Sequence, residues 1–181
     1  MTPSKLSIVG SSGAGKSTLG RRIAAKLGIP HLELDAVYHQ AHWTPLEDAE
    51  FRRRVTTFME QHPHWVIDGN YRAVQSLVWA RASQVVWLDL PRRQSMVRLL
   101  WRTLKGGVTR EELWNGNTER PMQIFDPNPE ENVVLWAWKR HDAQQKAYTT
   151  AMTDPQWHPL RFHRLRTQRA VERFVDQLES V

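Results

Sequence analysis

An eight-residue segment near the N-terminus constrains the fold of this chain more than any other feature. Residues 10–17 read Gly-Ser-Ser-Gly-Ala-Gly-Lys-Ser and come directly after the apolar run Leu6–Val9. Gly13 and Gly15 allow the backbone to curl so that consecutive N–H groups point inward. Residues 16–27 then repeat apolar side chains every four positions, which is the spacing of an amphipathic helix. A short buried strand, a glycine turn and a helix are therefore expected in succession.

This segment fits the pattern G-x-x-x-x-G-K-[ST] at every position. Inward N–H groups, the positive end of the helix dipole and the Lys16 ammonium all suit phosphate oxygens, and the Ser17 hydroxyl is the expected Mg²⁺ ligand. The sequence therefore predicts a P-loop that binds ATP with Mg²⁺. The predicted nucleotide-binding residues are Gly10, Ser12, Gly13, Ala14, Gly15, Lys16, Ser17 and Thr18. Thr18 is either a phosphate contact or an ordinary residue of the first helical turn.

Apolar runs and helical patterns alternate along the rest of the chain, which predicts an α/β fold with a parallel sheet. Further strands are expected at residues 31–35, 65–67, 85–90 and 161–165. Further helices are expected from a capping box at Thr44–Glu47, from Pro91 to Gly106, over residues 130–152, and after Thr167 as N-cap. Residues 105–129 lack a clear period and are expected to be a mobile segment over a site. We expect one domain over residues 1–181, with a lid-like insertion at about 105–141.

Composition and charge exclude several classes of protein. The chain has no cysteine, which excludes disulfides, thiolate zinc sites and a cysteine nucleophile. Its net charge of +6 favours anionic ligands, but the basic residues are spread along the chain, so specific nucleic-acid binding is not expected. No apolar run approaches the roughly 18 residues that span a bilayer, and residues 6–9 are too few for a signal peptide. A cytoplasmic protein without membrane association is expected; its oligomeric state is left open.

The segment Trp65–Arg72 resembles the nucleoside monophosphate kinase branch of P-loop proteins. It reads Trp-Val-Ile-Asp-Gly-Asn-Tyr-Arg, a strand that ends in Asp-Gly and is followed by an arginine. The resemblance implies that Asp68 lies near the Mg²⁺ shell and that Arg72 grips a phosphate of the acceptor. Asn70 and Tyr71 stand where adenylate kinases have Phe-Pro, so the resemblance does not extend to an adenylate acceptor.

Two arginines follow the strand at residues 85–90 and the helix start at Pro91. Arg98 and Arg102 are four residues apart, so they share one helix face, and no carboxylate lies within that turn. An incoming phosphate would relieve the repulsion between the two guanidinium groups; a solvated basic face is the alternative. The family resemblance implies that the first arginine packs on the nucleotide base and the second meets the transferring phosphate. Further candidate lid cations are Lys105, Arg110, Arg120, Lys139 and Arg140.

An acidic residue also ends the second expected strand. Leu32-Glu33-Leu34-Asp35 precedes Tyr38 and Trp43, and the resemblance implies that such an acid binds Mg²⁺ or the acceptor hydroxyl. The whole pattern resembles the adenylate-kinase-related topology modulation proteins over most of residues 5–105, and this resemblance implies the strand order 2-3-1-4-5. His31, Glu33 and Asp35 share a strand face and could bind a metal, but only Asp35 is expected to be functional. Asp89 is either a second acidic site residue or a structural cap.

These observations predict a three-layer α/β/α P-loop NTPase fold with a five-stranded parallel sheet. They also predict an ATP-dependent phosphotransferase for a small acceptor. A nucleoside monophosphate or related phosphate compound is the first choice of acceptor. The alternatives are a kinase of a hydroxylated metabolite, antibiotic or nucleotide sugar, and a nucleic-acid-binding regulator with an ATP switch site. The predicted catalytic residues are Lys16, Asp35, Arg98, Arg102 and Arg140. The predicted acceptor-binding residues are Asp35, Trp43, Asp68 and Arg72, and the predicted Mg²⁺ ligands are Ser17 and Asp68.

Overall fold

A single parallel sheet forms the centre of the molecule. The computed structural model describes residues 5–109, 112–118, 128 and 132–178. All neighbouring strands pair in parallel, in the order β2-β3-β1-β4-β5. The strands are β1 (Lys5–Gly10), β2 (His31–Glu33), β3 (Trp65–Asp68), β4 (Gln84–Leu88) and β5 (Arg161–Leu165). The predicted α/β fold with a five-stranded parallel sheet is confirmed, and the observed order is the one that the family resemblance implied.

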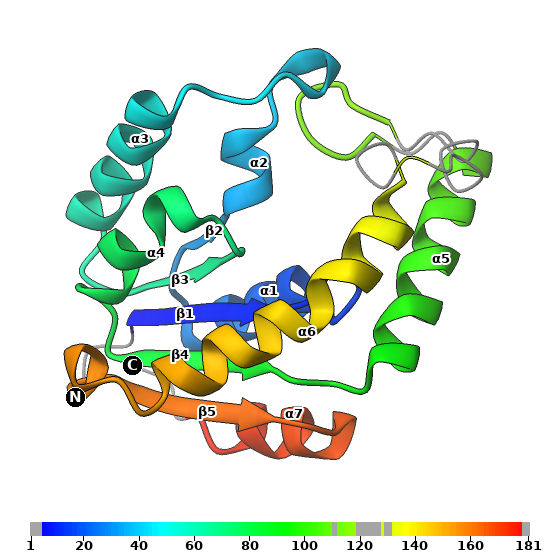
Figure 1. Cartoon of the computed structure of the whole chain (residues 1–181). Coiled ribbons are helices and arrows are strands. Elements are labelled where there is room, and N and C mark those ends of the chain that lie inside the picture. The colour runs from blue at the N-terminus through cyan, green and yellow to red at the C-terminus, as the bar shows by residue number, and fades with distance from the viewer. Residues whose placement is uncertain (1–4, 110–111, 119–127, 129–131, 179–181) are drawn as a thin grey trace.

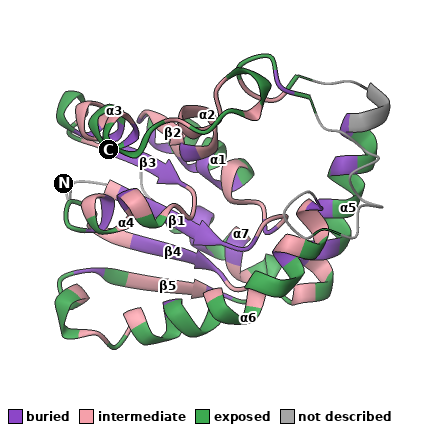
Figure 2. Ribbon diagram, turned by 45° about the horizontal axis from the view of Figure 1, so that its top comes forward, coloured by how far each residue is buried: buried purple, intermediate pink, exposed green. Residues whose placement is uncertain are grey.

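Helices cover both faces of the sheet and make the three layers (Figure 1). The helices are α1 (Lys16–Leu27), α2 (Leu34–Tyr38), α3 (Asp48–Gln61), α4 (Arg72–Trp79), α5 (Arg92–Thr109), α6 (Val133–Ala151) and α7 (Gln168–Asp176), with 3-10 turns η1 (Ala41–Trp43) and η3 (Pro155–Trp157). One core cluster joins α1 and α7 to one face of the sheet, and a second joins α3, α4 and α6 to the other. Figure 2 shows the resulting burial, with β1, β3 and β4 enclosed.

The alternating direction of the side chains along β1 explains why the sheet has two hydrophobic cores. Leu6 and Ile8 of β1 belong to the α1–α7 core, whereas Val9 belongs to the α3–α4–α6 core. Because successive side chains of a strand point to opposite faces, a strand buried on both sides must be apolar throughout. The run Leu6–Val9 therefore occupies the middle of the sheet, and it delivers Gly10 to the carboxyl edge where the loop begins.

Several predicted boundaries are wrong, among them the end of the strand expected at residues 85–90, which stops at Leu88. The second strand ends at Glu33, so Asp35 lies on α2 and not on a strand. The helix expected from Thr44 begins at Asp48, and its N-cap is Glu47, whose carboxylate accepts from the N–H groups of Ala49 and Glu50. Tertiary contacts explain the later helix start. The Leu46 N–H donates to the Tyr38 carbonyl and the Thr44 carbonyl accepts from the Gln40 N–H, so this stretch is bonded to the end of α2 and its following residues.

The helix after Pro91 does not end at Gly106 but continues to Thr109. The predicted lid-like insertion at about 105–141 thus begins inside α5 and ends inside α6, and residues 110–111, 119–127 and 129–131 lie outside the described residues. Within the described residues, no helix has the length and apolar character that a bilayer span requires.

Candidate active site

The glycine loop after β1 has the backbone conformation that its sequence requires. Gly13 and Gly15 have φ values of 77° and 93°, in the left-handed region that favours glycine. A Cβ on Gly13 would lie 2.1 Å from the carbonyl oxygen of Ser95 on α5, so no larger residue fits there. The loop leads directly into α1 at Lys16, so the positive end of the helix dipole is directed at the loop, as in an anion site. These features fit a bound nucleotide phosphate.

Lys16 lies at the meeting point of several charged groups. Its Nζ donates to the carbonyl oxygen of Ser11 at 3.3 Å. Burial lowers the pKa of Lys16, the carboxylates of Asp35 and Asp68 raise it, and the Arg102 guanidinium lowers it. The structure therefore brings together four predicted site residues from α1, α2, β3 and α5 around one point next to the loop.

Ser17 and Asp68 are in direct contact at the carboxyl end of β3. The Ser17 hydroxyl donates to Oδ1 of Asp68 at 3.0 Å, and Asp68 is only 2% exposed. Its second oxygen, Oδ2, lies 2.7 Å from Nε2 of His31. A hydroxyl and a carboxylate beside a phosphate-binding loop are the oxygen donors that Mg²⁺ prefers, so the donor set fits the predicted ion. Their role as Mg²⁺ ligands stays a prediction.

The His-Glu-Asp grouping of the structure differs from the one weighed in the sequence. Ligand atoms of His31, Glu33 and Asp68 lie within 4.8 Å of one another, whereas Asp35 is outside the group. Each member already has protein partners: Glu33 accepts from Arg21 at 2.7 Å and from the Trp114 indole at 3.2 Å, and His31 contacts Asp68. His31 therefore supports Asp68, whereas Glu33 is bonded to α1 and to Trp114.

The Asp35 side chain is held by Tyr71, which the sequence did not single out for this contact. The Tyr71 hydroxyl donates to Oδ1 of Asp35 at 2.6 Å, and Nε2 of His39 lies 3.2 Å from the same hydroxyl. Burial, together with the Asp35 charge, raises the pKa of Tyr71, so the phenol remains a donor. Burial lowers the pKa of His39, which Asp35 opposes. Oδ1 of Asp35 is thus oriented by a neutral donor.

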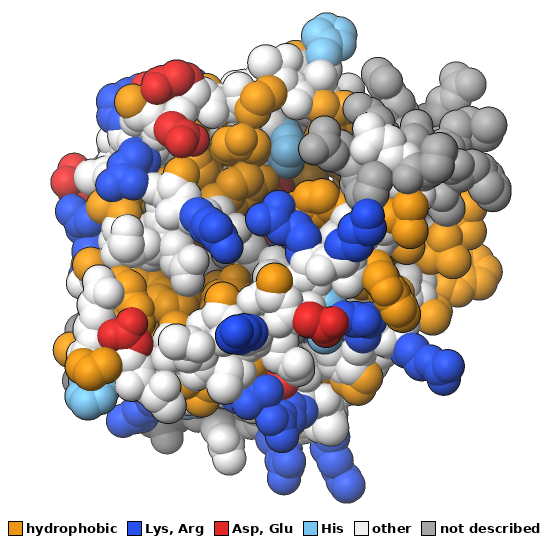
Figure 3. All heavy atoms as spheres, viewed as in Figure 1, with side chains coloured by type: hydrophobic (Ala, Val, Ile, Leu, Met, Phe, Trp, Pro, Cys, Tyr) orange, Lys and Arg blue, Asp and Glu red, His pale blue; other side chains and the backbone are white. Residues whose placement is uncertain are grey.

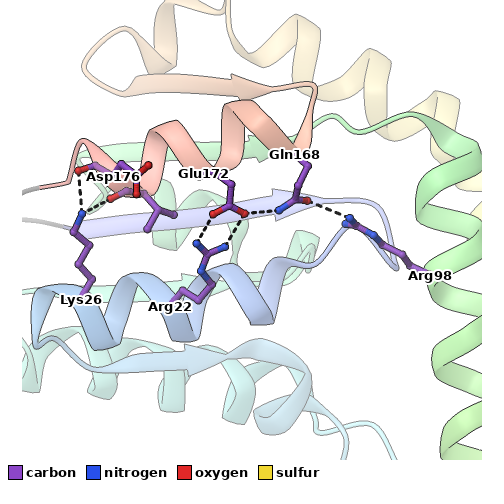
Figure 4. A network of polar contacts seen from close by, with 7 residues as sticks. Arg22, Lys26, Arg98, Gln168, Glu172 and Asp176 are labelled. Atoms are coloured by element: carbon purple, nitrogen blue, oxygen red, sulfur yellow. Dashed lines mark hydrogen bonds and ion pairs between the residues drawn. The ribbon is translucent and has the colours of Figure 1, made fainter.

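The predicted arginines lie in different surroundings. The Arg98 guanidinium lies 4.0 Å from the Cβ position of Gly15 and donates to Oε1 of Gln168 at 3.1 Å, which places it between the loop and α7 (Figure 4). Arg102 is near enough to Lys16 to affect its pKa. Arg140 stacks over the ring of Trp136 at 4.9 Å on α6, and no interaction among the described residues links it to the loop. Arg110 and Arg120 lie outside the described residues.

Arg72 and Asp89 both lie near α6, but in different surroundings. Arg72 is the first residue of α4, and its charge acts on the hydroxyl of Tyr148. Asp89 is bonded to Arg164 at 2.7 Å and accepts from Gln145 at 3.0 Å. These contacts join the end of β4 to β5 and α6, so the structural interpretation of Asp89 is the favoured one.

Asn70 is a site residue that sequence reasoning missed. Its side-chain amide bonds both main-chain groups of Gly10, with Oδ1 accepting from the N–H at 3.2 Å and Nδ2 donating to the carbonyl at 2.5 Å. Oδ1 also accepts from the Tyr148 hydroxyl at 3.0 Å. Asn70 therefore fixes the first residue of the loop to the end of β3. Its position directly after Asp68-Gly69 was the only signal in the sequence.

Comparison with known proteins gives a structural match. The chain is similar to the crystal structure of shikimate kinase from Bacteroides thetaiotaomicron, with a TM-score of 0.50 and 17% sequence identity over 96% of this chain and 95% of that one. No protein-family model matches the chain, and no curated protein does. At this identity the likeness concerns the fold. Together with the loop at residues 10–17, it shows that this chain has a P-loop kinase-like fold.

Proposed function

We propose that this protein transfers the γ-phosphoryl group of ATP to a hydroxyl group of a small acceptor. The observation that carries the proposal is the position of Asp35, whose carboxylate accepts from the Tyr71 hydroxyl at 2.6 Å and is near enough to Lys16 to oppose the lowering of the Lys16 pKa by burial. A carboxylate at that place would repel an acceptor phosphate but can accept the proton of a hydroxyl. The resemblance to topology modulation proteins and the likeness to a solved shikimate kinase support the kinase class.

In this proposal the loop amides and Lys16 hold the triphosphate, and Arg98 and Arg102 face it from α5. Mg²⁺ held by Ser17 and Asp68 would neutralise charge on the phosphates. Asp35 accepts the proton as the acceptor oxygen forms its bond to the γ-phosphorus, and the bond from that phosphorus to the ADP oxygen breaks. Catalysis of this kind depends mainly on positioning and electrostatics.

A phosphate-bearing acceptor is the second candidate, and Arg72 favours it. Arg72 is exposed at the N-terminus of α4, and within the described part of the chain it forms no ion pair. An exposed guanidinium at a helix N-terminus can receive a phosphate. A nucleic-acid regulator is less supported, since lysine and arginine side chains are dispersed over the face seen in Figure 3. A small-molecule acceptor and ATP remain the proposed partners.

The test is an ATP-consumption screen that compares neutral hydroxyl compounds, nucleoside monophosphates and DNA at about 0.15 M salt, where exposed charges are screened beyond about 8 Å. A hydroxyl acceptor predicts that Asp35→Asn abolishes transfer and that Arg72→Ala changes it little. The exposed carboxylate of Asp176 on α7 offers the matched control Asp176→Asn. An active Asp35→Asn variant combined with a strongly raised acceptor KM in Arg72→Ala would replace the first candidate by the second. Turnover stimulated by DNA alone would support the regulator.

A further inference from the structure

A short turn between α5 and α6 lies against the segment that carries Asp35. We call residues Glu112–Thr118 the strap. Its ends pair as an isolated bridge, and inside it the Leu113 N–H donates to the Asn117 carbonyl at 2.8 Å. Figure 1 shows the strap beside the loop that joins α2 to α3, far from it in sequence. The strap is thus a self-bonded unit that follows the helix bearing Arg98 and Arg102.

Two asparagine side chains of the strap bond the main chain of residues 36–43. The amide of Asn115 donates to the carbonyls of Ala36 at 3.1 Å and His39 at 2.6 Å. Asn117, which is 3% exposed, donates to the Gln40 carbonyl at 2.9 Å and accepts from the Trp43 N–H at 2.8 Å. Both ends of the Asn117 amide are therefore used to hold the neighbouring loop.

The loop that Asn117 holds has a strained backbone. His42 and Trp43 have φ values of 60° and 59°, so two consecutive non-glycine residues occupy the left-handed region. Such conformations persist when the surrounding structure over-determines them, and they gather at functional sites. The Trp43 N–H donates to the side-chain oxygen Oδ1 of Asn117, and this contact can maintain the conformation.

The strained loop and the strap together present two indole rings that are linked to Asp35 through His39 and Tyr71. Trp114 stacks on His39 with centroids 6.4 Å apart and meets Trp43 edge-on at 6.4 Å. Its Nε1 donates to Glu33, which fixes the ring. His39 in turn contacts the Tyr71 hydroxyl that bonds Asp35. The two indoles are half-buried, so part of each ring remains accessible.

We propose that the strap completes the acceptor subsite, with Trp43 and Trp114 as its wall and Asn117 as the positioning residue that sets the wall. This inference rests on the proposed function, because Asp35 must receive the acceptor for the wall to matter. The acceptor class is a hydroxyl compound built on a ring, since aromatic walls with a few fixed polar groups select flat ring faces. An open-chain polyol of the same carbon number lacks that face.

The first arm of the test measures amide exchange over residues 36–46 in wild type and in Asn117→Ala, each alone and with Mg-ADP. The variant should exchange faster there and normally over β1 and α1, because the Trp43 N–H loses its acceptor. Thr118→Ala is the matched control, since Thr118 is exposed on the same strap. Unchanged exchange in Asn117→Ala would overturn the positioning role, whatever the activity.

The second arm measures kinetics with ring and open-chain polyols, glucose against sorbitol, and with any acceptor from the screen. Asn117→Ala should lower the acceptor kcat/KM by about 10- to 100-fold while the ATP KM stays near wild type. The loss of its two side-chain hydrogen bonds should lower the melting temperature by about 4–8 °C, which leaves the variant folded at the assay temperature. Asn117→Asp keeps an oxygen for the Trp43 N–H and should recover part of the loss. Trp114→Phe keeps an aromatic ring, so its acceptor kcat/KM should lie between the values for wild type and Trp114→Ala.

The two proposals fail in different ways. Turnover with equal acceptor kcat/KM in wild type and Trp114→Ala, or a preference for open-chain acceptors, overturns the wall and leaves the kinase proposal intact. If Asn117→Ala impairs the ATP KM as much as the acceptor kcat/KM, Asn117 has a general structural role, and this result also overturns the proposed wall. No turnover with any hydroxyl acceptor overturns the proposed function, and the acceptor subsite with it.

Discussion

Asn70→Ala should destabilise the protein through the loop that precedes α1. The substitution removes three hydrogen bonds, two to the main chain of Gly10 and one from the Tyr148 hydroxyl. At about 1 kcal/mol of net stability per bond, the free energy of unfolding should fall by about 3 kcal/mol. The Tyr148 side chain is only 6% exposed, so its hydroxyl would lose a partner that water replaces poorly.

A double-mutant cycle separates this mechanism from a general loss of packing. Tyr148→Phe removes one bond and should reduce the free energy of unfolding by about 1 kcal/mol. The double variant should lose about 3 kcal/mol instead of the additive 4, because the two changes remove the same bond. Urea unfolding measures the free energy of unfolding of wild type, the two single variants and the double variant. The melting temperature of Asn70→Ala should fall by roughly 6–12 °C. Additive losses, or a loss below about 0.5 kcal/mol for Asn70→Ala, would refute the reasoning.

Three further predictions concern the site. Arg102→Ala should lower kcat by about 10³-fold or more with little change in ATP affinity, checked by single turnover and calorimetry; an equal kcat would make it a surface residue. Tyr71→Phe should lower kcat/KM for the acceptor but leave Mg-ATP binding unchanged, since it removes the hydroxyl contacts with Asp35 and His39, neither of which is a predicted nucleotide-binding residue. The pKa of His39 is lowered, so stability should fall as pH drops below about 6.5, and His39→Gln should flatten that fall in urea titrations.

The sign of the last prediction follows from proton binding. With a folded pKa below the unfolded one, the unfolded chain binds more protons between the two values, so the free energy of unfolding decreases as pH falls through that window. His163 is shifted in the same direction and contributes to the wild-type slope. The difference between wild type and His39→Gln isolates the His39 part. Identical slopes would show that His39 does not titrate differently in the folded state.

Much of the fold could be predicted because its determinants are local. The apolar run Leu6–Val9, the glycines of residues 10–17 and the helical period of residues 16–27 each follow from neighbours in the chain. The strand Arg161–Leu165 and the Thr167 N-cap were also predicted correctly, since Thr167 accepts from the N–H of Ala170. The pairing of Ser17 with Asp68 follows from motif chemistry and from the meeting of parallel strands at one edge.

Boundaries failed where tertiary contacts replaced local rules. The Thr44–Glu47 sequence has the composition of a capping box, yet main-chain bonds between residues 38–40 and 44–46 occupy that stretch and shift the cap to Glu47. Asp35 left the expected strand because β2 ends after its three pairs with β3. The sequence left the role of Asp89 open between a site residue and a structural cap. The pairing of β4 with β5 places Arg164 beside Asp89 and favours the structural role.

The sequence by itself determined the phosphate-binding loop, the parallel α/β class and the set of polar residues at the carboxyl edge of the sheet. Only the tertiary structure decided how those residues are held: Asn70 on Gly10, Tyr71 on Asp35, and Asn117 on Trp43. The physical reason is the distance along the sequence between the interacting residues. A glycine turn or a helical period depends on neighbours a few positions away, whereas each of these hydrogen bonds joins loops from distant segments, and their meeting is set by how the helices pack on the sheet.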